Sequence, residues 1–249
     1  MNKKRATSVV VVALFLLFLA VPTWADDWNN KDWPYANPSG ASTKQDNYLV
    51  ERKEFTMSYS NAKGTPNWTA WSLQGRDIGK APRMEFYPDQ DLPRSFKRVM
   101  PGDYSKSGFD RGHLCNHEDR SSTHETSHAT FTMANMMPQA PDVNRKAWEK
   151  FESYCRKQVK RGGSAFIICG PAGVGGVGSE GSAKTIGKGR EITVPAWCWK
   201  IAVFKSAGGE EKTVAIIMPN KMGVGEDWKP YQVDVGAVEK LTGYRFGRK

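Results

Sequence analysis

All four histidines of the chain lie in one stretch, residues 107–152, which also carries asparagine and glutamate side chains along an expected helix. The histidines are His113, His117, His124 and His128. Imidazole changes its charge near neutral pH, so a histidine can accept or give a proton under physiological conditions. A chain that places its four histidines within sixteen positions is expected to use at least one of them for chemistry.

One candidate motif in this stretch is HExxH, formed by His124, Glu125 and His128. On a helix, two histidines four residues apart face the same side and can bind zinc, with the glutamate as the base of a metalloprotease. The flanking residues 121–123 and 129–132 are rich in serine and threonine, which form helices poorly. These residues are equally well explained as polar surface residues on a short helix or loop, and a zinc metalloprotease stays an alternative function.

The second candidate consists of three blocks in a fixed order along the chain. They are Asp110-Arg111-Gly112-His113, then Asn135-x-x-Pro138-Gln139, then Asn144-x-x-x-Trp148-x-x-x-Glu152. A single histidine beside an arginine carries little information. Three blocks in this order, the last of them on an expected helix, are far more specific.

These blocks resemble the DNA/RNA non-specific endonucleases, the ββα-metal or His-Me finger nucleases. All three blocks match that family as they stand, and Arg83-x-x-Phe86-x-x-Asp89 resembles its preceding arginine segment. The resemblance extends over roughly residues 48–246, with the strong motifs confined to residues 83–156. It implies a metal-assisted endonuclease that hydrolyses DNA and RNA and leaves 5′-phosphate ends.

The residue types suit this reaction, which requires a base for the attacking water and stabilisation of the negative charge that develops on phosphorus. His113 is the expected general base, and it should act in its neutral form. Asn144 is expected to bind the metal directly. Glu152 lies about 12 Å further along a regular helix, so it is expected to reach the metal through water. One neutral oxygen ligand with several waters suits Mg²⁺, for which Mn²⁺ is a possible substitute.

Arginines in the matching segments are the expected phosphate ligands, because the guanidinium fork matches phosphate oxygens. Arg83 and Arg111 should contact the scissile phosphate and stabilise the transition state, and Arg156 should contact a neighbouring phosphate. No segment of the chain is typical of base-specific recognition, so DNA and RNA should be bound with little sequence preference and with strong inhibition by salt.

Two further residues of the blocks are expected to support the site. Asn135 should orient either the metal-binding helix or the loop that carries His113. Asp110 should brace the hairpin of the first block. Trp148 is expected to pack the helix, and His117 has no role that the motifs assign.

The element that must position these residues is a helix over residues 142–161, which follows Pro141 and ends at Gly162-Gly163. Apolar residues recur along it at every fourth position and predict a face buried in the core. They are Val143, Ala147, Phe151, Cys155 and Val159. A second row, one position further around the helix, consists of Asn144, Trp148, Glu152 and Arg156.

Strands are expected on both sides of this helix, at residues 48–59, 67–73, 164–169, 191–204 and 213–218, and a short final helix at residues 234–242. This order predicts an α+β fold with a mostly antiparallel central sheet flanked by helices. Residues 81–97 should form an extended loop. Residues 170–190 should form a mobile glycine-rich loop, because their GxGxxG pattern lacks the helix that a dinucleotide site requires.

The N-terminal segment of the chain indicates export, and the net charge indicates a polyanionic partner. Residues 1–25 combine a basic start, an apolar run and a small-residue cleavage site, as in a signal peptide, so the protein should be secreted or periplasmic and free of the membrane. Residues 26–45 are expected to form a loose arm before a nuclease domain at residues 46–249. Removing residues 1–25, which hold three basic residues and no acid, lowers the net charge from +10 to +7. A homodimer and a catalytically inactive nucleic-acid-binding module both stay open.

Four cysteines follow the signal segment, and export permits disulfides. We expect Cys169 and Cys198 to pair, because they lie on strands that could be neighbours. Cys155 falls on the apolar face of the expected helix, where a buried free thiol is equally plausible. Cys115 has no assigned partner.

Overall fold

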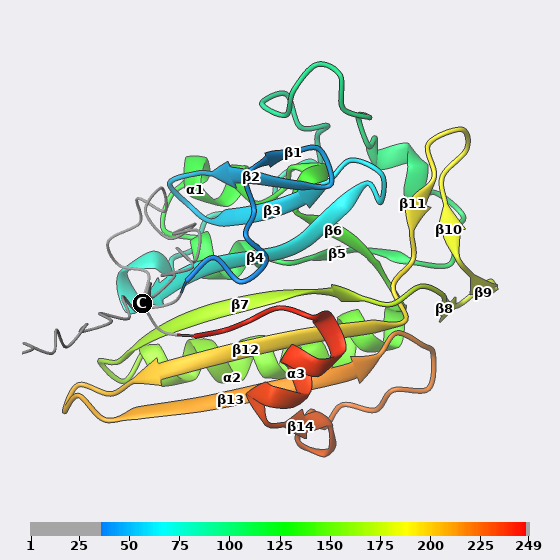
Figure 1. The fold of residues 1–249 in the computed structure, drawn as a ribbon. Coiled ribbons are helices and arrows are strands. Elements are labelled where there is room, and N and C mark those ends of the chain that lie inside the picture. Colours follow the sequence, from blue (N-terminus) through cyan, green and yellow to red (C-terminus); the bar gives the residue numbers. More distant parts are fainter. Residues whose placement is uncertain (1–35, 248–249) are drawn as a thin grey trace, which may run out of the picture.

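An eight-stranded antiparallel sheet forms the centre of the computed structural model, which describes residues 36–247 (Figure 1). Its strands, in order across the sheet, are β1 (Thr43–Lys44), β2 (Asn47–Glu51), β3 (Thr56–Ser60), β4 (Thr65–Gln74), β7 (Ser164–Ala172), β12 (Trp197–Lys205), β13 (Glu211–Pro219) and β14 (Gln232–Val233). Every neighbouring pair is antiparallel. The predicted α+β fold with an antiparallel central sheet is confirmed.

The helix predicted over residues 142–161 is present and packs on one face of this sheet (Figure 1). It begins with a π-helical segment, Val143–Trp148, and continues as α2, Glu149–Val159. The five residues of the predicted apolar face are all buried in the main core, which confirms that face. The second row differs from a solvated polar stripe, because Trp148, Glu152 and Arg156 are buried as well.

A two-stranded ribbon precedes this helix and completes a ββα unit. It pairs β5 (Asp110–His113) with β6 (Met136–Gln139), so that Asp110 lies opposite Gln139 and His113 opposite Met136. Between the strands lie a 3-10 turn at His117–Arg120, the short helix α1 (His124–Ala129) and a 3-10 turn at Met133–Asn135. The ribbon is narrow at Gly112, where a Cβ atom would stand 2.4 Å from Oε1 of Gln139, which explains the glycine of the first block.

Two of the expected strands are broken in the structure. The run at residues 48–59 forms a hairpin, β2 and β3, that turns where the Arg52 amide donates to the Phe55 carbonyl. The run at residues 191–204 divides into β11 (Ile192–Thr193) and β12, with Pro195 between them. Proline has no amide hydrogen to donate to a sheet, which accounts for this break.

The other expected elements are present. The strands at residues 67–73, 164–169 and 213–218 lie within β4, β7 and β13, and the segment at residues 81–97 contains no strand beyond an isolated bridge at Tyr87. The final helix is α3, Val235–Thr242, which is capped by Asp234 and ends at Gly243 with a φ of 74°. Three short 3-10 turns, Gly75–Asp77, Pro101–Tyr104 and Lys229–Tyr231, complete the described part of the chain.

The glycine-rich segment is more ordered than a simple loop. It holds β8 (Gly176–Gly178), which pairs with β9 (Gly181–Ala183), and β10 (Thr185–Ile186), which pairs with β11. A Cβ atom at Gly178 would stand 2.4 Å from the Gly108 carbonyl oxygen. The glycine therefore allows this hairpin to pack against the segment that leads into β5.

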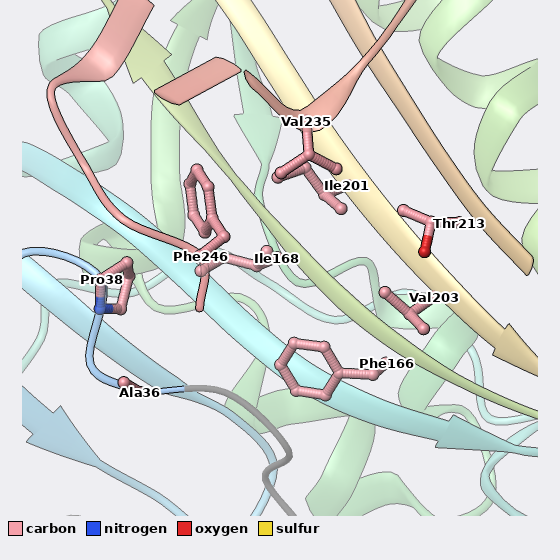
Figure 2. Close-up of a pocket in the computed structure, with 9 residues that line it drawn as sticks. All are labelled: Ala36, Pro38, Phe166, Ile168, Ile201, Val203, Thr213, Val235 and Phe246. Carbon is pink, nitrogen blue, oxygen red and sulfur yellow. The ribbon is translucent and has the colours of Figure 1, made fainter. Parts of the chain in front are cut away.

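The face of the sheet away from α2 is covered by α3, the C-terminal segment and the first described residues. They enclose a small apolar pocket of about 70 Å³ (Figure 2). Its lining residues are Ala36, Pro38, Phe166, Ile168, Ile201, Val203, Thr213, Val235 and Phe246. The expected loose arm is anchored here from Ala36 onward, since Ala41 is buried and the Trp68 indole donates to Ser39. Residues 1–35, including the proposed signal peptide, lie outside the described residues.

The predicted disulfide between Cys169 and Cys198 is wrong, because all four cysteines are free, buried thiols. The two strands are neighbours as expected, but Cys169 lies opposite Lys200 and Cys198 lies opposite Pro171. The cysteines are therefore offset by two residues along the ladder. No helix among residues 36–247 is long and apolar enough to cross a membrane.

Candidate active site

The buried ring of Phe131 brings together three side chains, two from the segment of residues 113–117 and one from residue 83. The imidazole of His113 meets it edge-on, with ring centroids 4.9 Å apart, and the ring of His117 lies 5.6 Å away. The guanidinium of Arg83 lies 5.4 Å from the same ring centroid. Two of the predicted site residues, His113 and Arg83, thus share one aromatic support, and His117 joins them.

A second ring, Phe86, supports the next predicted residue. The guanidinium of Arg111 lies 4.7 Å from the centroid of Phe86, and Phe86 lies 5.4 Å from His113. The predicted arginine segment, residues 83–89, therefore packs against the ribbon that carries Arg111 and His113. The structure gathers both arginines expected at the scissile phosphate around the expected base.

His113 lies in an environment that favours its neutral form. The side chain is buried, and its Nε2 atom has no hydrogen-bond partner. Burial, followed by the charge of Arg83 and the proximity of His117, lowers the pKa of His113 well below its usual value. An imidazole held in this way is uncharged at neutral pH and can accept a proton.

Asn135 fixes the chain that follows His113. Its side-chain oxygen accepts from the Cys115 amide at 3.0 Å, and its side-chain nitrogen donates to the carbonyls of Cys115 and Thr130 at 2.8 and 2.9 Å. The Leu114 amide also donates to the Asn135 carbonyl. Of the two roles considered for Asn135, these contacts support orientation of the His113 loop.

Asp110 links the ribbon to the start of the helix. The Asn144 amide nitrogen donates to Asp110 at 2.9 Å, which turns the amide oxygen of Asn144 away from this bond. The exposed Arg145 adds two bonds to the same carboxylate, at 2.8 and 2.6 Å. Asp110 therefore braces the helix against the ribbon, where the sequence suggested a brace within the hairpin, and its bond to the Asn144 nitrogen leaves the Asn144 oxygen free. The motifs gave no indication of Arg145.

Glu152 is buried, and both of its carboxylate oxygens are engaged. The ammonium group of Lys200 bonds to Oε1 at 2.8 Å, and the Asn116 amide donates a short hydrogen bond to Oε2. Burial raises the pKa of the Glu152 carboxyl, while Lys200 and Arg156 oppose this rise. Burial lowers the pKa of Lys200, but Glu152 and nearby groups outweigh it, so that pKa is raised and the ion pair is maintained.

The motifs missed both partners of Glu152. For Lys200 a signal exists, because a lysine interrupts an otherwise apolar run in β12. The ammonium group lies 4.2 Å from the ring of Trp148 and 5.6 Å from that of Trp71. For Asn116, the only signal in the sequence is its position, three residues after His113.

Arg156 occupies a different environment from the one expected of a phosphate ligand. Its guanidinium is buried and lies 3.2 Å from Asp119 and 2.7 Å from Glu118, with Glu149 at 3.8 Å. The other oxygen of Asp119 accepts from the Trp71 indole at 3.0 Å. Arg156 thus joins α2 to the turn that follows His113, a placement that favours a positioning role.

Asn220, another residue that the motifs missed, anchors the end of the ribbon. Its side chain accepts from the Ala140 amide at 2.7 Å and donates to the carbonyls of Pro138 and Pro195 at 3.0 and 2.9 Å. These bonds hold the connection between β6 and the helix against the end of the large sheet. The position of Asn144 depends on this connection.

The HExxH motif falls on α1, a helix of only six residues. His124, Glu125 and His128 are all exposed, and the His128 ring stacks on Tyr87 with centroids 4.4 Å apart. Within residues 36–247, no group of three or more His, Cys, Asp or Glu side chains is arranged to hold a metal ion. The description of these residues as polar surface groups therefore fits the structure better than a zinc site.

The helix provides oxygen atoms that can bind a metal ion. The Asn144 amide oxygen is free of the bond to Asp110, and Glu152 is a buried carboxylate on the same helical segment. Such a set suits Mg²⁺, which keeps several waters and needs few protein ligands, better than it suits zinc. The residues present therefore fit the hard divalent cation that the motifs imply.

Comparisons with known proteins show the family to which the chain belongs. A family model for DNA/RNA non-specific endonucleases matches residues 34–249. The chain is similar to a nuclease from Nostoc sp., with 41% identity over 222 residues that cover 84% of this chain and 78% of that protein. It is 29% identical to the mitochondrial nuclease EXOG of Xenopus laevis over 76% of this chain, and it spans 55% of that relative.

A solved structure shows the same fold. In the crystal structure of an EndoG/EndoGI complex, the similar chain has a TM-score of 0.70 and 26% sequence identity, with 80% of this chain and 84% of that chain covered. This likeness confirms the ββα-metal arrangement that the three blocks predicted. It extends well beyond the three blocks, since 80% of this chain is covered.

Proposed function

The chain belongs to the DNA/RNA non-specific endonuclease family, and on this premise we propose that it hydrolyses phosphodiester bonds in both DNA and RNA and leaves 5′-phosphate ends. One relationship carries the proposal most strongly. Asp110 and Asn116, three residues before and after His113, bond to Asn144 and Glu152 respectively. The proposed base is thus held between the two residues proposed to serve the metal.

In the proposed reaction, His113 takes a proton from the water whose oxygen bonds to phosphorus, and the bond to the 3′ oxygen breaks. The leaving 3′ oxygen keeps the electron pair of that bond and takes a proton from a second water molecule. Nε2 of His113 is buried without a partner, so Nδ1 is the nitrogen proposed to accept the proton. Arg83 and Arg111 stabilise the additional negative charge on the phosphoryl oxygens. Their packing on Phe131 and Phe86 keeps both guanidinium groups beside His113.

The proposed cofactor is Mg²⁺, with Mn²⁺ as a substitute, held by the Asn144 amide oxygen and, through water, by Glu152. A bound divalent cation would neutralise charge on the phosphate and on the leaving oxygen. The donor set supports this choice, because it consists of one neutral oxygen and one carboxylate. Asn135 and Asp110 act by orienting His113 and Asn144.

The proposed substrates are DNA and RNA of any sequence. The net charge of +7 after removal of residues 1–25 supports binding to polyanions. We further propose export to the periplasm or the medium, supported by the signal-like composition of residues 1–25. Arg156, buried among acidic groups, is better supported as a positioning residue than as a phosphate ligand.

Purified protein should cleave plasmid DNA and RNA at low salt with Mg²⁺ and lose this activity with a chelator. His113→Ala should abolish cleavage, while Glu125→Gln should leave it intact. Cleavage of a protein substrate that is lost in Glu125→Gln and kept in His113→Ala, with nucleic acid left intact, would instead support the zinc metalloprotease. A gel shift with DNA but no cleavage by folded wild type would instead identify a binding module and refute the proposal.

A further inference from the structure

The carboxylate of Glu152 is held by residues from two separate parts of the fold. Lys200 comes from the middle of β12 in the central sheet, and Asn116 comes from the turn that follows β5. Glu152 and Lys200 are buried, so water cannot replace either contact easily. The helix that carries Glu152 is thereby joined at one point to both the sheet and the segment of His113.

We propose that Asn116 and Lys200 are positioning residues for the reaction, an inference that rests on the proposed function. Asn116 ties the segment of His113 to α2, and Lys200 compensates the charge of Glu152 and fixes its orientation. Neither residue needs to touch the substrate. Each carboxylate oxygen has two lone pairs, so Glu152 can hold both partners and still accept a hydrogen bond from water.

The surroundings of Lys200 explain why it can act as a fixed support. Its ammonium group lies beside the rings of Trp148 and Trp71, at 4.2 and 5.6 Å, and ends on Glu152. A buried charge is tolerated only when it is paired and well packed, and an unpaired partner would be strongly destabilising. Lys200 and Glu152 therefore depend on each other for their position.

Asn116 has two separable contacts, which makes its role testable. Its side-chain oxygen accepts from the Glu118 amide at 2.7 Å and caps the 3-10 turn, while its side-chain nitrogen donates to Glu152. Serine and aspartate can both supply a capping oxygen. Asn116→Ser removes the donor to Glu152, and Asn116→Asp places a second carboxylate against it, while both can retain the cap.

The experiment compares wild type, Asn116→Ser, Asn116→Asp and Lys200→Met, with the exposed Lys205→Met on the same strand as a matched control. Residues that support metal ligands commonly change metal affinity or activity by about 10–100-fold when replaced. We expect kcat to fall by about tenfold or more in Asn116→Ser and further in Asn116→Asp, with KM changed by less than about twofold. Mn²⁺ affinity, measured by calorimetry, should fall in the same order, and Lys205→Met should match wild type.

Hydrogen exchange provides a measurement that does not depend on activity or on the metal. Amides of residues 114–120 should exchange faster in Asn116→Ser than in wild type, even at temperatures where thermal unfolding shows both to be folded. If wild type fails to cleave nucleic acid, the proposed function is wrong, and exchange still decides whether Asn116 ties this segment to α2. Unchanged exchange, or unchanged kcat and Mn²⁺ affinity in both Asn116 variants, would overturn the inference. If Lys200→Met does not fold, the Asn116 variants decide alone.

Discussion

Asn144 and Asp110 are joined by a hydrogen bond of 2.9 Å, which runs from the amide nitrogen at the start of the helix to the first residue of β5. The bond crosses 34 positions of sequence and determines which atom of Asn144 is free. Because the nitrogen is engaged, the oxygen remains for a metal ion. Asp110 therefore orients the proposed metal ligand Asn144, although the two residues belong to different blocks of the sequence.

Replacing Asp110 with alanine should weaken metal binding, because the amide of Asn144 would lose the contact that orients it. Changes of this kind commonly cost about 10–100-fold in metal affinity or activity. Titration of Mn²⁺ into the folded variant measures the effect. Arg145→Ala is the matched control, since the exposed Arg145 bonds to the same carboxylate and leaves the bond between Asp110 and Asn144 in place. Equal losses in both variants would assign the effect to the charge around Asp110 and not to Asn144.

The activity of the wild type should persist well below pH 6.5 and then decline. The general base must be neutral, and the pKa of His113 is lowered well below its usual value by burial, then by Arg83 and His117. Activity is therefore lost only as the pH falls through this lowered pKa. His113→Ala should reduce kcat by roughly 10²–10⁴-fold, the usual contribution of a general base. A decline centred near pH 6.5 in the pH profile of kcat/KM would contradict the burial of this histidine.

His113 should also make the folded state less stable in acid. Its pKa is lower when folded than when unfolded, so below about pH 6.5 the unfolded chain binds more protons than the folded chain. The stabilisation is complete above that pH and is lost as the pH falls towards the folded pKa. Denaturant unfolding of wild type and His113→Ala between pH 4 and 8 measures this, and the variant should show the weaker pH dependence. His124→Ala, at an exposed histidine, should behave as wild type.

The three blocks indicated the candidate site because all three belong to one ββα unit, whose elements contact one another. His113, Asn144 and Glu152 belong to neighbouring elements, and the helical spacing of the apolar residues identified which side of α2 is buried. Lys200 and Asn116 escaped prediction because their contacts with Glu152 span 48 and 36 positions. A local sequence pattern does not indicate which lysine of a distant strand will pair with a given carboxylate. The acidic partners of Arg156 likewise become visible only in the fold.

The strand errors have a local cause. The run at residues 48–59 alternates well enough to suggest one strand, but residues 51–54 place four charged residues in a row where the chain turns back. The cysteine error arises from register, because adjacency of β7 and β12 does not place Cys169 opposite Cys198. A shift of two residues along a ladder cannot be read from either strand alone.

The thiols should be inert in the native protein and reactive after unfolding. All four are buried, and burial raises the pKa of Cys169 to about 12, so almost no thiolate exists at neutral pH. A thiol reagent should therefore modify no cysteine in the folded state and all four in denaturant. Protein that is purified and modified without any reductant should also show four reactive cysteines in denaturant. If only two cysteines react in denaturant and the mass of the protein is two mass units below that of the fully reduced chain, then a disulfide is present, as the sequence suggested.

Arg83 and Arg156 should respond differently to replacement, although the motifs assigned phosphate contacts to both. Arg83 is exposed beside His113, so Arg83→Ala should raise KM for DNA and reduce the slope of log KM against log salt by about one, as expected for one lost phosphate contact. Arg156→Ala should leave that slope unchanged. It should instead lower the free energy of unfolding, by about 3–5 kcal/mol, because Asp119 would stay buried without its cation. Salt-dependent kinetics and denaturant unfolding of the two variants separate these effects. A reduced salt slope with unchanged stability in Arg156→Ala would show that Arg156 leaves its acidic partners to bind phosphate.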